Sequence, residues 1–234
     1  MADRSPKNLL TAIAALAPLV RSHSDLIERE RKLPQAALDP LIEAGVFRMC
    51  VPRSLGGLEV DVTTLLSAIE EVARADGSAG WCTMIGATSG LISGYLEPSI
   101  AREIYGDARG VTGGVFAPRG HARLQNDTYV ASGRWPFASG VGHCNWLMGG
   151  CLVTDENGTA PSPPIARMLL FPSEDVVIHD TWDVAGLRGT GSHDIEVQEL
   201  TVPVTRSVDL TTDRPLETGT LYRFPVFGLL ALGI

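Results

Sequence analysis

The spacing of apolar residues changes its period once along this chain, near residue 111. Before that point apolar residues recur every three or four positions, as from Leu9 to Ile27, which is the period of a helix packed on one face. After it, short apolar runs at 111–116, 128–132, 146–153, 168–171, 176–178 and 195–202 are separated by Gly, Pro, Asn and Asp. We therefore expect an N-terminal all-helical domain over residues 1–110 and a central antiparallel β-barrel or sandwich over residues 111–215.

The alternation in the last of these runs shifts by one residue. Its apolar positions are odd-numbered up to Val197 and even-numbered from Leu200 onward. Because strand side chains alternate between the two faces of a sheet, an extra residue would bring both sets to one face. We expect a β-bulge near Gln198 or Glu199.

The final stretch, residues 224–234, is apolar and uncharged. It is much shorter than the roughly 20 residues that a membrane-spanning helix needs, so no membrane anchor is expected. It has the character of the start of a buried helix, and it stops without a terminating glycine-and-turn signal. We expect residues 216–234 to begin a C-terminal helical bundle that is cut off.

The composition is that of a folded protein with an acidic balance. Hydrophobic residues make up 44% and charged residues 20% of the 234 positions, which supports a substantial core. The net charge of -8 and the lack of a Lys/Arg cluster make nucleic acid and anionic membranes poor partners. The four cysteines form no CxxC pair, which favours reduced thiols and a cytoplasmic location. His143 and Cys144 are adjacent and would face opposite ways on a strand, so no metal site is expected.

A predicted helix over residues 79–95 carries no charged side chain. A helix that is apolar around its whole circumference is buried on all sides. It is therefore either the central helix of a bundle or a wall of a cavity. Trp81 is a candidate for such a wall, and a large core aromatic residue is the ordinary alternative.

The segment from Gly133 to Trp146 combines aromatic rings, one hydroxyl and several glycines. Rings supply stacking surface, the Ser139 hydroxyl can bond to a ring heteroatom, and glycine lets backbone N–H groups approach a ligand closely. Such a segment can line a flat aromatic ligand, or it can be an ordinary hairpin with a packed tryptophan. The residues alone leave both interpretations open.

Four segments resemble, in their order along the chain, the acyl-CoA dehydrogenase superfamily. They are LIEAGVF with VPRSLGG at 41–57, GGVFAPRG at 113–120, GRWPFASGVGHCNW at 133–146 and WDVAGLRGTGSHD at 182–194. The last two are most similar to the two-component flavin-dependent monooxygenase branch, which includes aromatic and steroid hydroxylases that a partner reductase supplies with reduced flavin. The resemblance spans essentially the whole chain.

This resemblance implies FAD or FMN as the cofactor. In the family a strand of the β-domain lies along the flavin, and the matching positions here are Val115, Phe116, Ala117 and Pro118, without the family's Thr and Glu. A second element places an aromatic residue and a hydroxyl beside the isoalloxazine ring, and it matches Phe137, Ala138 and Ser139. Ser139 is thereby expected near the reactive ring nitrogen.

The resemblance also gives candidates for catalysis and for the substrate pocket. Ser139 is the first catalytic candidate, because one hydroxyl in an apolar slot can orient the flavin ring. His143 is the second, either as a base that deprotonates a phenol or as a structural histidine beside Trp146. Trp81 and Thr88 are the candidates for the substrate pocket, where related aromatic hydroxylases carry a histidine.

The implied activity is that of a flavin-dependent oxidoreductase, first of all a monooxygenase that hydroxylates an aromatic or polycyclic substrate with reduced flavin and O₂. An acyl-CoA dehydrogenase is the alternative, and a truncated inactive remnant or an interaction subunit is a third interpretation. The expected partners are a small-molecule substrate, a flavin reductase, and further copies of the chain in a homodimer or homotetramer formed through the missing C-terminal domain. The residues leave open the substrate, the catalytic base and the choice between FMN and FAD.

Overall fold

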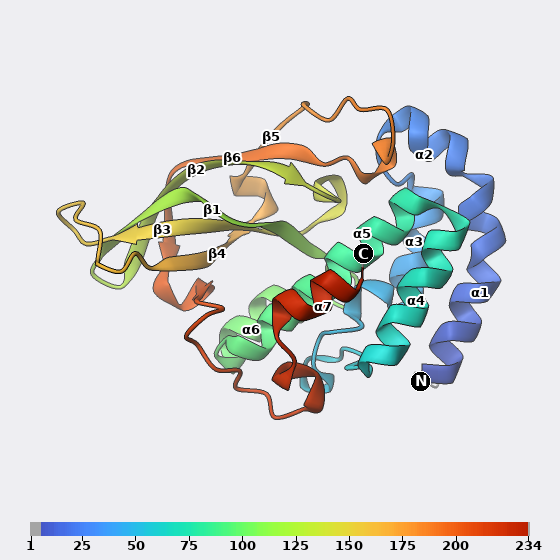
Figure 1. Cartoon of the computed structure of the whole chain (residues 1–234), viewed down its shortest axis with the longest axis horizontal. Helices are drawn as coiled ribbons and strands as arrows, with labels where there is room; N and C mark the ends of the chain where they lie inside the picture. The colour runs from blue at the N-terminus through green and yellow to red at the C-terminus, as the bar shows by residue number, and fades with distance from the viewer. Residues whose placement is uncertain (1–5, 234) are drawn as a thin grey trace.

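A computed structural model describes residues 6–233 of the chain, in which a group of helices lies beside a β-sheet (Figure 1). The helices of the N-terminal part are α1 (Pro6–Ser22), α2 (Ser24–Glu30), α3 (Gln35–Ala44), α4 (Val62–Ala75), α5 (Gly77–Ser89) and α6 (Pro98–Tyr105). The helical N-terminal region that the sequence predicts is therefore confirmed. The stretch expected as one helix over 79–95 is α5 followed by the 3₁₀ segment η3 (Gly90–Tyr95).

The helix ends follow local signals. The Asp61 carboxylate accepts the Thr64 N–H at 2.9 Å and so caps α4. Gly45 ends α3 in the left-handed conformation, with φ of 84°, which a residue with a side chain rarely adopts. These two signals fix where α4 begins and where α3 ends.

α5 is the central helix of this part. Ten of its thirteen residues are buried, and it packs on α4, on the start of β1 and on the last helix, α7 (Val226–Leu232). Burial of most of its circumference explains why α5 carries no charge, because a buried charge without a partner is very costly; the face with Trp81 and Ile85 is half-buried. Of the two alternatives, the central helix of a bundle agrees with the ten buried residues, and a wall of a cavity agrees with the half-buried face that carries Trp81.

Within the described residues the strands form one seven-stranded sheet in the order β5-β6-β2-β1-β3-β4-β7. The strands are β1 (Thr112–Gln125), β2 (Thr128–Ala138), β3 (Trp146–Thr154), β4 (Ala166–Pro172), β5 (Val177–His179), β6 (His193–Pro203) and β7 (Ser207–Val208). The expectation of an antiparallel barrel or sandwich is wrong in two respects, because β1 and β3 pair in parallel and the described strands form one open sheet, with β5 and β7 at its edges. β2 pairs antiparallel with one side of β1. The chain then crosses the end of the sheet, and β3 pairs parallel with the other side of β1.

The bulge expected near Gln198 is present. The pairing of β2 with β6 shifts register between Ala131 and Gly133, whose partners are Leu200 and Val197. β6 has two residues between these pairs where β2 has one, so it carries one extra residue at this point, where Glu199 has a φ of 49°.

Trp135 is fully buried inside the sheet, and three glycines make room for it. Cβ atoms built at Gly120, Gly133 and Gly149 would lie 2.3, 2.8 and 2.6 Å from its ring. Its indole N–H donates to the Gly150 carbonyl at 2.7 Å. The tryptophan of the 133–146 segment is thus a core residue that anchors β2 just ahead of Phe137.

A helix is present where the apolar tail predicts one. α7 buries Val226 and Leu229 beside α5, while Phe227 and Leu232 are each 54% exposed. Among residues 6–233, no helix has both the length and the apolar character needed to span a bilayer.

Candidate functional site

Phe137 is held in an unusual backbone conformation at the end of β2. The pairing of β2 with β6 shifts between Trp135 and Ala138, and Phe137 lies in this bulge with a φ of 67°. A side chain in the left-handed region costs about 1–2 kcal/mol. The ring is nonetheless 66% exposed, and it meets Trp182 edge to face with 6.0 Å between ring centroids. A strained, exposed aromatic residue on a rigid strand indicates a binding function rather than core packing.

Ser139, two residues further on, lies between the helical part and the sheet. It is only 6% exposed. Trp81 on α5 donates its indole N–H to Ser139 Oγ at 2.9 Å, and Ser192 Oγ lies 2.7 Å from the same oxygen. The structure therefore brings together two predicted site residues, Trp81 and Ser139, that are far apart in the sequence.

The hydrogen bonding continues from Ser192 to Thr190. The two hydroxyl oxygens lie 2.7 Å apart, and Thr190 Oγ1 donates to the Leu187 carbonyl at 2.9 Å. That carbonyl also accepts the Trp182 indole N–H at 3.1 Å. We call Ser139, Ser192 and Thr190 the hydroxyl chain. It links the indole on α5 to the indole that contacts Phe137.

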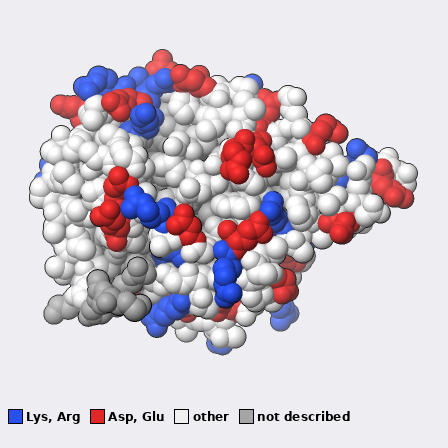
Figure 2. Space-filling view, turned by 180° about the vertical axis from the view of Figure 1, so that it is seen from behind, with Lys and Arg blue, Asp and Glu red and all other residues white. Residues whose placement is uncertain are grey.

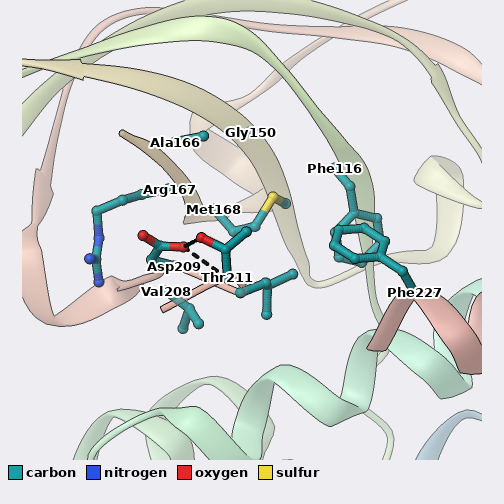
Figure 3. Close-up of a pocket in the computed structure, with 10 residues that line it drawn as sticks. Phe116, Gly150, Ala166, Arg167, Met168, Val208, Asp209, Thr211 and Phe227 are labelled. Carbon is teal, nitrogen blue, oxygen red and sulfur yellow. Dashed lines mark hydrogen bonds between the residues drawn. The ribbon is translucent and has the colours of Figure 1, made fainter. Parts of the chain in front are cut away.

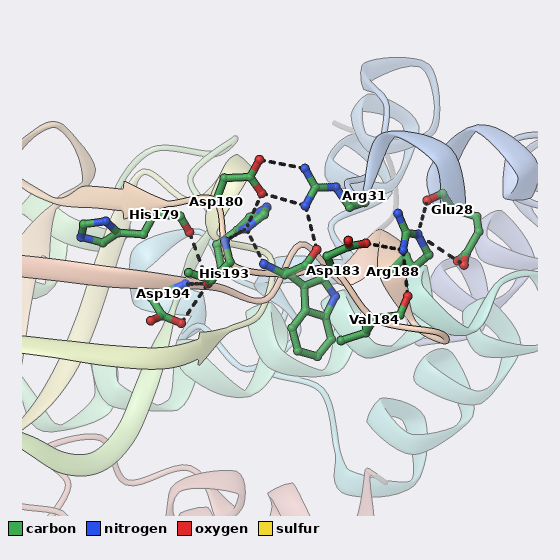
Figure 4. A network of polar contacts seen from close by, with 11 residues as sticks. Glu28, Arg31, His179, Asp180, Asp183, Val184, Arg188, His193 and Asp194 are labelled. Carbon is green, nitrogen blue, oxygen red and sulfur yellow. Dashed lines mark hydrogen bonds and ion pairs between the residues drawn. The ribbon is translucent and has the colours of Figure 1, made fainter.

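Polar contacts hold the loop between β5 and β6 against α2 (Figure 4). Arg31, directly after α2, contacts the two Asp180 carboxylate oxygens at 2.7 and 2.8 Å and donates to the Trp182 carbonyl at 2.9 Å. Arg188 donates to the Glu28 carbonyl at 3.3 Å. Such exposed pairs add little to the free energy of unfolding, but they fix the loop that carries Trp182.

His193, the first residue of β6, holds the same loop through the backbone. Its Nδ1 accepts the N–H groups of Thr181 and Trp182, each at 3.2 Å. Burial lowers the pKa of His193 and so favours the neutral ring, which can accept hydrogen bonds at Nδ1. His193 is therefore an acceptor that supports the Trp182 loop.

His143 has the character of a packed residue. It lies in the 3₁₀ turn η4 (Val141–His143), with 5.6 Å between the centroids of its ring and that of Phe47. Burial lowers its pKa to about 4, and a base of that pKa is a weak proton acceptor at neutral pH. These observations favour the structural interpretation of His143 over a catalytic base. No group of three or more His, Cys, Asp or Glu side chains in the described residues could hold a metal ion.

The stretch that is predicted to lie along the flavin is part of β1. The stretch Val115, Phe116, Ala117 and Pro118 is irregular, and its pairing with β3 shifts on both sides of Pro118. Phe116 meets Phe227 of α7 edge to face at 5.7 Å, and both line a cavity of about 70 Å³ with Arg167 and Asp209 (Figure 3). The residues that line this cavity are different from those of the hydroxyl chain. Phe116 lines this cavity and Ser139 belongs to the hydroxyl chain, and contact of one flavin with both residues stays a prediction.

Thr88 is also apart from the hydroxyl chain. It is 1% exposed, and its hydroxyl donates to the Met84 carbonyl of its own helix at 2.7 Å. Trp81 lies two turns earlier on α5, about 10 Å away along the axis. Of the two predicted pocket residues, Trp81 alone contacts Ser139.

Sequence reasoning missed Thr190, Ser192 and Trp182 as site residues, although all three lie in the 182–194 motif. Strand alternation gives no signal for the two hydroxyl residues, because Thr190 ends the 3₁₀ segment η6 (Arg188–Thr190) and Ser192 precedes the first residue of β6. The glycine between Arg188 and Thr190 is informative. A Cβ at Gly189 would lie 2.0 Å from Ile27 Cγ2, so this position allows the loop to approach α2 closely.

Three comparisons with known proteins agree with this arrangement. Residues 11–98 match the family described as acyl-CoA dehydrogenase, N-terminal domain. The chain is 31% identical over 194 residues to HsaA, the oxygenase subunit of a flavin-dependent monooxygenase from Rhodococcus jostii (strain RHA1), covering 82% of this chain and 50% of HsaA. It is 33% identical over 195 residues to indole-3-acetate monooxygenase from Pseudomonas putida, covering 82% and 49%. The chain spans about half the length of these relatives.

The solved structure of XiaF from Streptomyces sp., in complex with FADH2 and glycerol, has a similar fold. It superimposes with a TM-score of 0.88 at 25% identity, over 97% of this chain and 58% of XiaF. The arrangement of the helices beside an open sheet is therefore shared with a flavin-binding protein.

Proposed function

This chain is a relative of the flavin-dependent monooxygenases in the acyl-CoA dehydrogenase superfamily, as its four motifs predict, and we propose that it is the flavin-binding part of such an oxygenase. The proposed reaction is the hydroxylation of an aromatic substrate by O₂, with a reduced flavin as the electron donor. The observation that carries the proposal is the pairing of the strained, exposed Phe137 ring with the nearly buried Ser139 hydroxyl two residues away.

The residues around Ser139 fit a flat, partly polar ring. Phe137 and Trp182 present aromatic surface, Ser139 presents a hydroxyl that little water reaches, and α5 behind them carries no charge. A bound reduced flavin supplies two electrons to O₂, so that one oxygen atom enters the substrate and the other leaves as water. The protein's own residues orient the ring, exclude water and hold a hydrogen bond at Ser139 Oγ.

The cofactor is proposed to be FAD or FMN. XiaF, a protein of similar fold, binds FADH2, which supports a flavin cofactor. HsaA is the oxygenase subunit of its monooxygenase, so we expect a separate reductase to supply the reduced flavin. The relative from P. putida acts on indole-3-acetate, which supports an aromatic substrate. Phe116 and its cavity stay proposed as a second contact for flavin or substrate.

The domain organisation is proposed as residues 1–110, 111–215 and 216–234. Its last part would begin a C-terminal helical bundle through which a homodimer or homotetramer forms. Its support is α7, which packs on α5 and leaves Phe227 and Leu232 exposed. All four cysteines are free thiols, which agrees with the proposed cytoplasmic location.

The test combines binding with product analysis. Wild-type protein and Ser139→Ala are titrated anaerobically with oxidised and reduced FMN and FAD, and Ser93→Ala, another buried serine outside the site, is the matched control. Reduced flavin, O₂ and a panel of phenols and indoles are then mixed with the protein, and products are examined by mass spectrometry for one added oxygen atom.

We expect flavin binding that weakens in Ser139→Ala alone and a hydroxylated product from at least one aromatic compound. A dehydrogenase would behave differently, because an acyl-CoA would bleach its bound oxidised flavin without O₂. Bleaching of that kind with no hydroxylated product would overturn the monooxygenase proposal in favour of the dehydrogenase.

A further inference from the structure

In this structure the three hydroxyls of the hydroxyl chain can all donate in one direction, toward the Leu187 carbonyl. Thr190 donates to the Leu187 carbonyl, so its oxygen accepts from Ser192, and the oxygen of Ser192 in turn accepts from Ser139. Trp81 can only donate, and it fills one lone pair of Ser139 Oγ. In this direction Ser139 has one lone pair left for a ligand and no proton to offer it.

The far end of the chain has one donor too many. The Leu187 carbonyl receives the Thr190 hydroxyl at 2.9 Å, the Thr190 backbone N–H at 3.1 Å and the Trp182 indole N–H at 3.1 Å. A carbonyl oxygen has two lone pairs, so it stays satisfied when the Thr190 hydroxyl turns away. Giving up this bond is therefore inexpensive.

Rotation of the Thr190 hydroxyl reverses the whole chain. Thr190 then donates to Ser192, Ser192 donates to Ser139, and the Ser139 proton is directed outward. Each hydroxyl keeps its own proton, so the change is three rotations and involves no proton transfer. The two inner contacts, both 2.7 Å, allow either atom to be the donor.

We propose that Thr190 and Ser192 are positioning residues that let the Ser139 hydroxyl alternate between accepting and donating a hydrogen bond to one ring nitrogen of a flavin. The central ring nitrogen carries a proton in reduced flavin and is a bare acceptor in oxidised flavin. A fixed hydroxyl direction would suit one of these forms and oppose the other. This inference rests on the proposed function, because it assumes that flavin binds beside Ser139.

The test uses variants that leave Ser139 in place. In Ser192→Ala, a Ser139 proton that points toward position 192 has no acceptor. In Thr190→Val, a Ser192 proton that points toward position 190 has no acceptor. Both variants therefore hold the Ser139 proton outward, which suits oxidised flavin. Because a buried unpaired donor is costly, we expect the ratio of the reduced-flavin Kd to the oxidised-flavin Kd to rise about tenfold in each.

Three controls test whether a change in this Kd ratio arises from the hydroxyl chain. Thr190→Ser retains a hydroxyl and is expected to restore the wild-type ratio. Ser93→Ala removes a buried hydroxyl that bonds the Gly90 carbonyl outside the chain, and it is expected to leave the ratio unchanged. In a Ser139→Ala background, Ser192→Ala should no longer shift the ratio, because the chain then ends before the ligand.

The outcomes separate the two proposals. Failure of wild-type protein to bind either flavin form overturns the proposed function and this inference with it. Flavin binding with ratios within twofold of wild type in both Ser192→Ala and Thr190→Val overturns the inference and leaves the function standing. Circular dichroism confirms folding, and the isosteric Thr190→Val alone decides the matter if Ser192→Ala does not fold.

Discussion

Replacing Phe137 with glycine is expected to leave the fold nearly as stable as before. Glycine adopts the φ of 67° without the strain of about 1–2 kcal/mol, although it loses about 0.5–1 kcal/mol through its freedom in the unfolded chain. The ring is 66% exposed, so its remaining burial and its contact with Trp182 contribute about 1–2 kcal/mol. These effects nearly cancel, and the net change should lie within about 1 kcal/mol.

Phe137→Ala is the matched variant, because it removes the same ring and keeps the strained backbone. It should be about 1 kcal/mol less stable than Phe137→Gly. Urea denaturation followed by circular dichroism measures both, and anaerobic titration measures the Kd for flavin, which should rise in both variants.

Three results would each refute a part of this reasoning. A loss above about 3 kcal/mol in Phe137→Gly would show that the ring is a core residue. Equal stability of the glycine and alanine variants would show that the backbone at this position stores no strain. If flavin affinity is unchanged in both variants, Phe137 does not belong to the binding site.

Trp135→Phe should destabilise the protein by about 2–4 kcal/mol in urea denaturation, because it leaves a cavity and removes the indole hydrogen bond to the Gly150 carbonyl; a loss below about 1 kcal/mol would contradict the packing described. Gly149→Ala should cost at least about 2 kcal/mol, since its Cβ would lie 2.6 Å from that indole ring, and an unchanged urea midpoint would contradict this. Burial lowers the pKa of His143 to about 4 from about 6.5 in the unfolded chain, so the unfolded chain binds the proton more readily and the free energy of unfolding falls as pH drops from about 6.5 towards 4. His143→Gln should weaken this dependence of the free energy of unfolding on pH, measured by urea midpoints between about pH 4 and 8. The control His121→Gln, at an exposed histidine, should leave the dependence unchanged. The same pH dependence in wild type and His143→Gln would contradict the buried state of His143.

Much of the local structure could be predicted because its causes lie within a few residues. The cap at Asp61, the left-handed Gly45 and the bulge at 198–199 each follow from a short-range rule on hydrogen bonding or alternation. The uncharged stretch of α5 predicted a largely buried helix, because desolvating a charge is costly whatever the fold. The four motifs likewise indicated the family, because their residues and their order along the chain are properties of the sequence itself.

The pairing of distant segments could not be predicted in this way. Whether β3 joins β1 in parallel depends on how the chain crosses the end of the sheet, and hydrophobic alternation is the same for either direction. For that reason the sequence suggested an antiparallel barrel, whereas the sheet is open with one parallel pair.

The sequence by itself determined which residues of the candidate site carry useful chemistry, and the tertiary structure alone decided which of them act together. Trp81 and Ser139 are 58 residues apart, and Ser139 and Ser192 are 53 apart, so their contacts exist only once α5, β2 and the start of β6 have packed. In the folded chain Phe116 contacts Phe227 and Thr88 donates to the Met84 carbonyl, and the place of these two residues in the same site stays a prediction. A hydroxyl's chemistry is fixed by its residue type, but its hydrogen-bond partners, and therefore the direction of its proton, are set by neighbours that only the folded chain supplies.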